Sequence, residues 1–201
     1  GGVTRAVRLV VTPATFIDDA WIRLAHDGRL LASVRLDGPR AARTHVRVRI
    51  AALNLAVDGR TDTRGMWEGA LAAPAELELW SPERPRLYAV RIEAGDDVLH
   101  EQIGFRTVRV DGENILLNGE PIFLRGICLH EEEIGAAPAR IITSAVAGAL
   151  LGAAKNDLGC NFIRLAHYPH SEIMTRMADQ IGLLVWSEVP VYWRVNWTNA
   201  T

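Results

Sequence analysis

The chain is 201 residues long, 49% of it is apolar, and its formal net charge is −2. This composition supports one large folded domain or two small ones and argues against disorder. The small charge and the scattered basic residues argue against a nucleic-acid partner. No apolar run has the length of a membrane span. The two cysteines, Cys128 and Cys160, are too few for a disulfide framework and are expected to be reduced.

The first 106 residues alternate apolar and polar side chains with the period of two that is typical of antiparallel strands. The pattern predicts strands around residues 46–50, 76–79 and 88–92. Turn signals separate the strands, at Asp27-Gly28, Asp37-Gly38-Pro39, Asp58-Gly59, Ser81-Pro82 and Gly95-Asp96. Several short strands at this spacing predict a β-sandwich of the immunoglobulin type.

Beyond residue 106 the pattern changes. Hairpin turns are expected at Asp111-Gly112 and Asn118-Gly119, followed by an apolar run over 122–129. Further apolar strands are predicted around Phe162 to Leu165 and over 183–186. Two helices are predicted between the strands, and their start and stop residues are Thr143 and Gly159 for the first, Ser171 and Gly182 for the second. Strands apolar on both faces, alternating with helices and without a Gly-rich phosphate loop, predict the first three strands of a (β/α)8 barrel.

Polar and aromatic side chains follow each of these three strands. His130 and Glu131 follow the first, His167 and Tyr168 the second, and Glu188 the third. In a (β/α)8 barrel the carboxyl ends of the strands share one rim, where the chemistry takes place. Imidazoles, carboxylates and aromatic rings suit a sugar, which has apolar CH faces and a belt of hydroxyls. The sequence therefore predicts a sugar-binding rim.

Each of these residues also has a structural interpretation. A histidine at a strand end is more often a hydrogen-bonded structural residue than a catalytic one. The run of glutamates from Glu131 is compatible with a solvated loop, and its spacing from His130 fits no closed metal site. Arg125 and Arg164 are expected inside strands, where a buried guanidinium needs a carboxylate, so a core ion pair and a sugar contact are both open. The same position on three successive strands favours the binding site.

Long stretches of the chain resemble glycoside hydrolase family 2, the family of β-galactosidases, β-glucuronidases and β-mannosidases. GGVTRAVRL resembles the end of its sugar-binding jelly-roll domain or the junction with the next domain. TPATFIDDAWIRL and WSPERPRLYAVRI resemble parts of its immunoglobulin-like domain. The entry into its catalytic barrel is similar to GFRTVRVDGENILLNGEPIFLRGICLHEE. The second barrel strand is similar to GCNFIRLAHYPHSE, and the third is similar to GLLVWSEVPVYW. The resemblance implies that residues 1–10 end the preceding domain or form its junction with the next, that 11–106 form the sandwich, and that 107–201 begin the TIM barrel.

The resemblance implies a retaining β-glycosidase, most similar to a β-galactosidase, with β-glucuronidase and β-mannosidase as alternatives. Such enzymes use one carboxylate as acid/base and a second as nucleophile. In the family the acid/base glutamate follows an asparagine at the fourth strand, and the nucleophile lies near the end of the seventh. This sequence contains no Asn-Glu pair. We therefore expect neither catalytic carboxylate in the chain and no turnover by the chain alone.

The resemblance assigns sugar contacts to His130 and His167 and a subsite wall to Arg164. The complete set of predicted substrate-binding residues is His130, Glu131, Arg164, His167, Tyr168 and Trp193, with Glu188 and Arg125 in supporting or structural positions. No cofactor and no metal are expected, because Tyr192 and Arg194 occupy the positions at which some β-galactosidases bind magnesium. Cys128-Leu129 replaces the family's usual Asn-Arg, which weakens the choice between galactoside and glucuronide.

The expected partners are a β-linked sugar substrate and the remaining domains of a parent enzyme. The compartment stays open between cytoplasmic and periplasmic or secreted, because the sequence lacks both an initiator Met and a signal peptide. Two other classes of function are also open. One is a non-catalytic carbohydrate-binding or scaffold module that works through the sandwich. The other is a homo-oligomer formed through the open edge of the parallel sheet.

Overall fold

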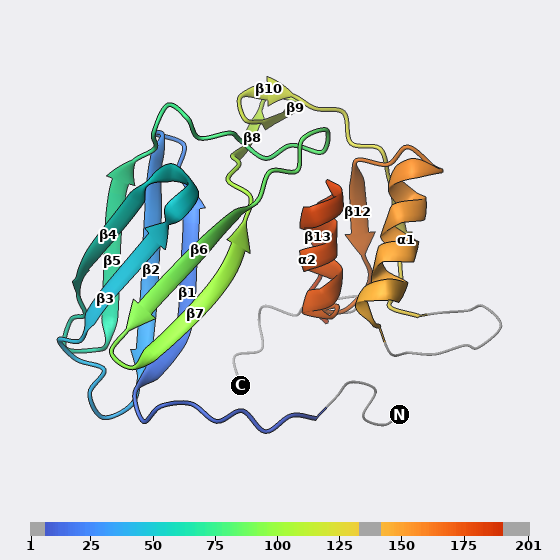
Figure 1. Ribbon diagram of the computed structural model, residues 1–201. Coiled ribbons are helices and arrows are strands. Elements are labelled where there is room, and N and C mark those ends of the chain that lie inside the picture. The colour runs from blue at the N-terminus through green and yellow to red at the C-terminus, as the bar shows by residue number, and fades with distance from the viewer. Residues whose placement is uncertain (1–6, 133–141, 191–201) are drawn as a thin grey trace, which may run out of the picture. The chain divides into compact units, whose positions relative to one another are not determined.

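The structure is a computed structural model that describes residues 7–132 and 142–190. Two compact parts make up the chain. One contains residues 8–81 and 86–122, and the other contains Val7, residues 82–85 and the described residues from 123 onward (Figure 1).

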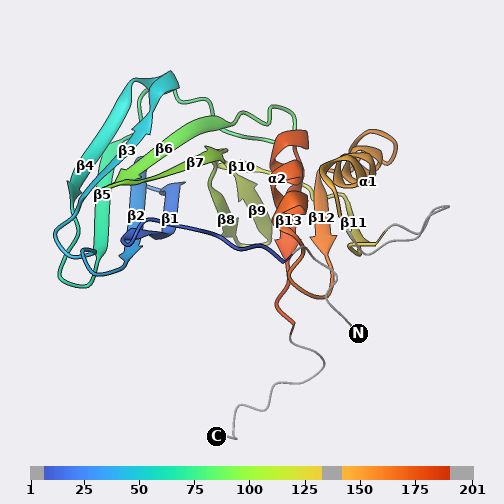
Figure 2. The ribbon, with the colours of Figure 1, turned by 60° about the horizontal axis from the view of Figure 1, so that its bottom comes forward.

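The first part is a sandwich of two antiparallel sheets (Figures 1 and 2). One sheet has the order β1-β2-β5, and its strands are β1 (Phe16–Leu24), β2 (Arg29–Asp37) and β5 (Met66–Ala72). The other has the order β4-β3-β6-β7, and its strands are β3 (His45–Ile50), β4 (Leu55–Arg60), β6 (Tyr88–Ala94) and β7 (Asp97–Ile103). A short 3-10 helix, η1 (Ala51–Leu53), follows β3. The predicted immunoglobulin-like sandwich is confirmed.

Alternation of side chains builds the core of the sandwich. In β3, Val46, Val48 and Ile50 are buried, while the arginines between them are exposed. Val34 on β2 and Ile92 on β6 are fully buried in the same cluster. Each such side chain stabilises the fold by about 1.5–3 kcal/mol relative to an exposed one. The period of two therefore sets which face of each sheet meets the other.

Two of the strand and turn predictions in the sandwich are wrong. Residues 76–79 alternate in exposure but form no strand; the Leu77 amide closes a turn onto the Pro74 carbonyl, and the Glu78 amide donates to the Tyr88 hydroxyl at 2.9 Å. Asp58-Gly59 lies inside β4 instead of forming a turn. A Cβ at residue 59 would lie 2.2 Å from the indole nitrogen of Trp67, so the glycine makes room for a buried tryptophan.

A small sheet ends the first part of the chain. It has the order β10-β9-β8, and its strands are β8 (Val108–Asp111), β9 (Asn114–Leu117) and β10 (Glu120–Pro121). Asn118 and Gly119 have φ angles of 54° and 90° and form the predicted two-residue turn between β9 and β10. The Asn118 side chain also accepts from the Thr107 amide and donates to the Trp80 carbonyl, both at 3.0 Å.

The second part alternates strands and helices. Its elements in chain order are β11 (Gly126–Leu129), α1 (Ser144–Asn156), β12 (Phe162–Leu165), α2 (Glu172–Ile181) and β13 (Leu184–Ser187). The three strands are parallel in the order β11-β12-β13, as predicted for the start of a barrel. The first strand begins later than the apolar run over 122–129. No helix in the described part of the chain is long and apolar enough to cross a membrane.

The predicted caps place the two helices. The Thr143 hydroxyl accepts from the Val146 amide, and the Ser171 hydroxyl accepts from the Ile173 amide, each at 3.3 Å. Gly182 ends α2 with a φ of 90°, and a Cβ there would lie 2.3 Å from the Pro82 carbonyl oxygen. A side chain at this position would therefore clash with the backbone, which explains the glycine.

The helices cover one face of the parallel sheet. Ile163 and Leu165 on β12 are fully buried in a cluster with side chains of both helices, including Leu151 and Met174. The alternate residues point to the other face, where Trp186 is 59% exposed. In the described residues the helices therefore pack on one side of the sheet, as they do around a (β/α)8 barrel.

Candidate functional site

The ends of the three parallel strands bring the predicted polar residues together. In the ladder, Leu129 is opposite Leu165, and Leu165 is opposite Ser187, so the strands end level with one another. His130, His167 and Glu188 then follow at the carboxyl edge of the sheet. We call the cluster formed by His130, Glu131, Arg164, His167, Tyr168 and Glu188 the strand-end site.

Three rings form one side of the strand-end site. The His130 and His167 rings meet edge to face with their centroids 5.4 Å apart, and the Tyr168 ring lies 6.0 Å from His130. Both histidines are exposed to solvent, whereas Tyr168 is half-buried. The two imidazoles thus present hydrogen-bonding edges to solvent from adjacent strand ends, beside an aromatic surface.

An ion pair fixes the second histidine. The Arg164 guanidinium contacts Glu188 Oε1 through Nε at 2.8 Å and Nη2 at 2.7 Å. Nδ1 of His167 lies 3.3 Å from Arg164 Nη2 and 3.4 Å from Glu188 Oε2. Hydrogen bonding to Glu188, and secondarily to Cys128, raises the pKa of Arg164 above its ordinary value. The Nδ1 edge of His167 is thereby engaged, and its Nε2 edge is left for a ligand.

Glu131 links the end of β11 to the start of α2 and to Tyr168. Its side chain is buried, and its carboxylate accepts from the Ser171 amide at the start of α2 at 2.9 Å. The Glu131 amide donates to the Tyr168 hydroxyl at 3.3 Å. The interpretation of Glu131 as part of a solvated loop is therefore wrong, because a carboxylate at a helix N-terminus is stabilised by unpaired amides and by the helix dipole.

His170 is a residue of this cluster that the predicted site omitted. It is buried, it stacks on Tyr168 with 4.8 Å between centroids, and its Nε2 lies 2.9 Å from the Ala166 carbonyl oxygen. The hydrogen bond spans the segment that carries His167, so His170 holds the shape of that segment. Its position three residues after His167 was the available sequence signal.

Two predicted residues lie elsewhere. Arg125 precedes β11, at the opposite end of the strand from the site, and its exposed guanidinium lies 3.5 Å from the Gly159 carbonyl. The expectation of a buried guanidinium inside a strand is wrong for Arg125, because the strand begins after it. Trp193, Tyr192 and Arg194 lie outside the described residues. Among the residues that the structure describes, no cluster of three His, Cys, Asp or Glu side chains is arranged to hold a metal ion.

The fold and the strand-end site define an immunoglobulin-like domain followed by the opening strands of a (β/α)8 barrel. Residues 15–106 match the sequence family "Glycosyl hydrolases family 2", and residues 108–199 match "Glycosyl hydrolases family 2, TIM barrel domain". The chain therefore belongs to glycosyl hydrolase family 2.

Relatives and solved structures agree with this assignment. A β-galactosidase of Arthrobacter sp. is 30% identical over 188 residues, covering 92% of this chain and 17% of that protein. The β-glucuronidase of Homo sapiens is 30% identical over 208 residues, covering 94% and 30%. A structure of Faecalibacterium prausnitzii β-glucuronidase has a TM-score of 0.69 and 30% identity, covering 89% of this chain and 29% of that one. The chain thus spans less than a third of the length of each of these proteins.

Proposed function

We propose that the chain forms the immunoglobulin-like domain and the first part of the catalytic barrel of a retaining β-glycosidase, and that the strand-end site binds the terminal sugar of a β-galactoside. The observation that carries this proposal is the contact between His130 and His167, at 5.4 Å, from the carboxyl ends of adjacent parallel strands. Substrates of (β/α)8 enzymes bind at this edge of the sheet. We propose that residues 1–10 end the preceding domain or form a junction, that residues 11–106 form the sandwich, and that residues 107–201 begin the barrel.

Each residue of the site has a proposed role. His130 and the Nε2 edge of His167 hydrogen-bond sugar hydroxyls, and the Tyr168 ring packs against the sugar's CH groups. Arg164 and Glu188 orient His167 through their ion pair. Glu131 positions the segment that carries Tyr168. Trp193, which lies outside the described residues, is proposed as a further sugar contact.

The two carboxylates of the strand-end site are already engaged. Glu188 is paired with Arg164, and Glu131 accepts from the Ser171 amide. A retaining mechanism needs an acid/base and a nucleophile about 5 Å apart across the scissile bond. We therefore propose that residues outside this chain supply both carboxylates and that the chain alone does not hydrolyse a chromogenic β-galactoside. Measurable turnover by the pure chain would contradict this.

A β-glucuronide is the second candidate substrate. The relatives from Homo sapiens and Faecalibacterium prausnitzii are named β-glucuronidases, which favours an acidic sugar. Against it, the Arg164 guanidinium in the strand-end site is neutralised by Glu188 and offers little to a uronate carboxylate. Comparing methyl β-galactoside with methyl β-glucuronide in the same binding experiment separates the two candidates.

Calorimetry with methyl β-galactoside tests the proposal. His130→Ala and His167→Ala should each weaken binding about tenfold, because each removes a hydrogen bond to a hydroxyl and leaves its partner unpaired. His26→Ala is the matched control, since His26 is an exposed histidine between β1 and β2 of the sandwich. Equal affinities for all four proteins would contradict a sugar site at the strand ends.

Two further partners belong to the proposal. The rest of a parent enzyme would pair with the edge strands β11 and β13, each of which has a neighbour on one side only in the described sheet. Two copies of the chain pairing through the same edges would give a homo-oligomer. Light scattering separates these cases, because a monomer at all concentrations contradicts the homo-oligomer.

A further inference from the structure

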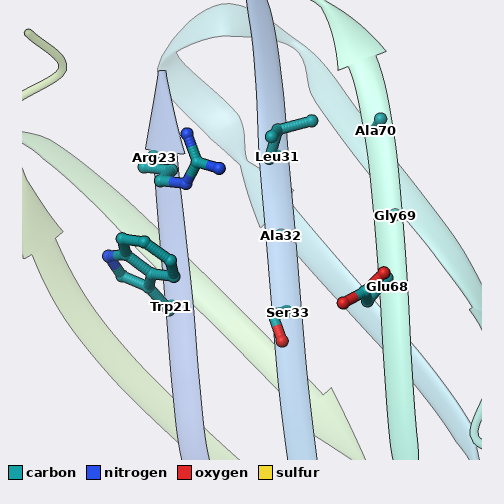
Figure 3. Close-up of a pocket in the computed structure, with 8 residues that line it drawn as sticks. All are labelled: Trp21, Arg23, Leu31, Ala32, Ser33, Glu68, Gly69 and Ala70. Atoms are coloured by element: carbon teal, nitrogen blue, oxygen red, sulfur yellow. The ribbon is translucent and has the colours of Figure 1, made fainter. Parts of the chain in front are cut away.

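The outward face of the sheet β1-β2-β5 carries a hollow of about 420 Å³, shown in Figure 3. Trp21 and Arg23 on β1 form one wall, and Glu68 and Ala70 on β5 form the opposite wall. Ser33 on β2 is a small residue between Trp21 and Glu68. The strand register explains the hollow, because Ser33 is opposite Trp21 on one neighbouring strand and opposite Glu68 on the other. A short side chain between two long ones leaves a trough across the sheet.

Trp21 is unusual for a solvent-facing position. Alternation makes the outer face of such a sheet polar, yet the Trp21 side chain is 62% exposed. The guanidinium carbon of Arg23 lies 4.8 Å from the indole centroid, in a cation–π contact. This contact restrains the indole, which therefore presents a fixed apolar surface at the edge of the hollow.

The polar groups of the hollow are available to a ligand. Within the residues that the structure describes, neither the Ser33 hydroxyl nor the Glu68 carboxylate has a hydrogen-bond or ion-pair partner. Arg23 contributes donors, Glu68 contributes acceptors, and Ser33 contributes both. One guanidinium and one carboxylate leave the hollow without formal net charge.

We propose that this hollow binds a neutral pyranose of a β-linked oligosaccharide. The indole would pack against the apolar CH face of the ring, while Arg23 and Glu68 exchange hydrogen bonds with its hydroxyls. The volume lies within the range of about 300–1,000 Å³ that is typical of small-ligand sites. A neutral sugar is favoured over a uronate, because the hollow has no net positive charge to offset the desolvation of a carboxylate. The proposal does not depend on the function of the strand-end site.

An NMR titration of the 201-residue chain with lactose tests the proposal. The Trp21 indole N–H and the amides of Ser33 and Glu68 should shift together in one saturable process. Trp21→Ala should weaken this process roughly tenfold through loss of the stacking surface. Val98→Ala should leave it unchanged, since Val98 is a 41% exposed apolar residue on the other sheet. Absence of these shifts at millimolar lactose, or equal weakening by both substitutions, would overturn the proposal.

Two further arms sharpen the test. The double variant His130→Ala/His167→Ala should keep the lactose-induced shift of the Trp21 indole. Sugar binding at the hollow is thereby tested independently of sugar binding at the strand-end site. Methyl β-glucuronide should bind at Trp21 more weakly than methyl β-galactoside. Tighter binding of the glucuronide would contradict a neutral ligand, and loss of the indole shift in the double variant would show that the sugar acts at the strand ends instead.

Discussion

Replacing Glu131 tests whether this residue positions the strand-end site by holding the start of α2. Its buried carboxylate accepts from the Ser171 amide at the first turn of α2. A hydrogen bond to a charged group contributes about 1.5–3 kcal/mol. A carboxylate at a helix N-terminus adds about 0.3–1 kcal/mol. Glu131→Ala should therefore lower the free energy of unfolding of this part of the chain by about 2–4 kcal/mol.

The measurement has two readouts, urea unfolding followed by circular dichroism and hydrogen exchange at the Ser171 amide. Glu131→Gln keeps an acceptor for the Ser171 amide but removes the negative charge at the start of α2. It should therefore lower the free energy of unfolding by about 1 kcal/mol, the upper end of the helix-dipole contribution. Glu113→Gln is the control, because Glu113 is exposed in the turn between β8 and β9. If Glu131→Ala leaves both the unfolding free energy and the protection of the Ser171 amide unchanged, Glu131 does not hold α2 in place.

Three further predictions concern stability. Lys155 Nζ donates to the Pro82 and Gly182 carbonyls at 2.8 and 2.9 Å, so Lys155→Met should cost about 2 kcal/mol in urea unfolding. Gly59→Ala should cost about 2 kcal/mol or more by clashing with Trp67, whereas Gly152→Ala, in α1 with open space around it, should stabilise by about 0.5–1 kcal/mol. The pKa of Asp62 is lowered chiefly by the Met66 amide. The contribution of the Asp62 carboxylate to stability is therefore present above the unfolded pKa and is lost as pH falls through the lower folded pKa. Asp62→Asn should flatten the acid side of a curve of unfolding free energy against pH. An NMR titration of the Asp62 carboxyl with a midpoint at or above 3.8 would contradict this.

Local patterns predicted most of the fold for identifiable physical reasons. The alternation in β3 predicted a strand because one face had to be buried, and Thr143 and Ser171 marked helix starts because their hydroxyls accept from helix amides. The errors fall where distant residues decide the outcome. Residues 76–79 alternate in polarity but have no strand to pair with. Gly59 leaves space for the side chain of Trp67, which lies on another strand.

The candidate site was predictable in position but not in detail. Parallel strands that end level bring His130 and His167 together, which topology alone indicates. Burial of Glu131 could not be predicted, because it depends on the start of α2, forty residues later in the chain. The ion-pair partner of Arg164 could not be predicted either, because Glu188 comes after the neighbouring strand β13, 24 residues later in the chain.

The most direct test of the strand-end site is an NMR titration of the His130 and His167 imidazoles with methyl β-galactoside. We predict that the resonances of both rings shift with a single dissociation constant and that ring-to-sugar NOEs appear for both. If neither ring responds while methyl β-galactoside is bound elsewhere on the chain, or if only one ring responds, the two histidines do not form one sugar site.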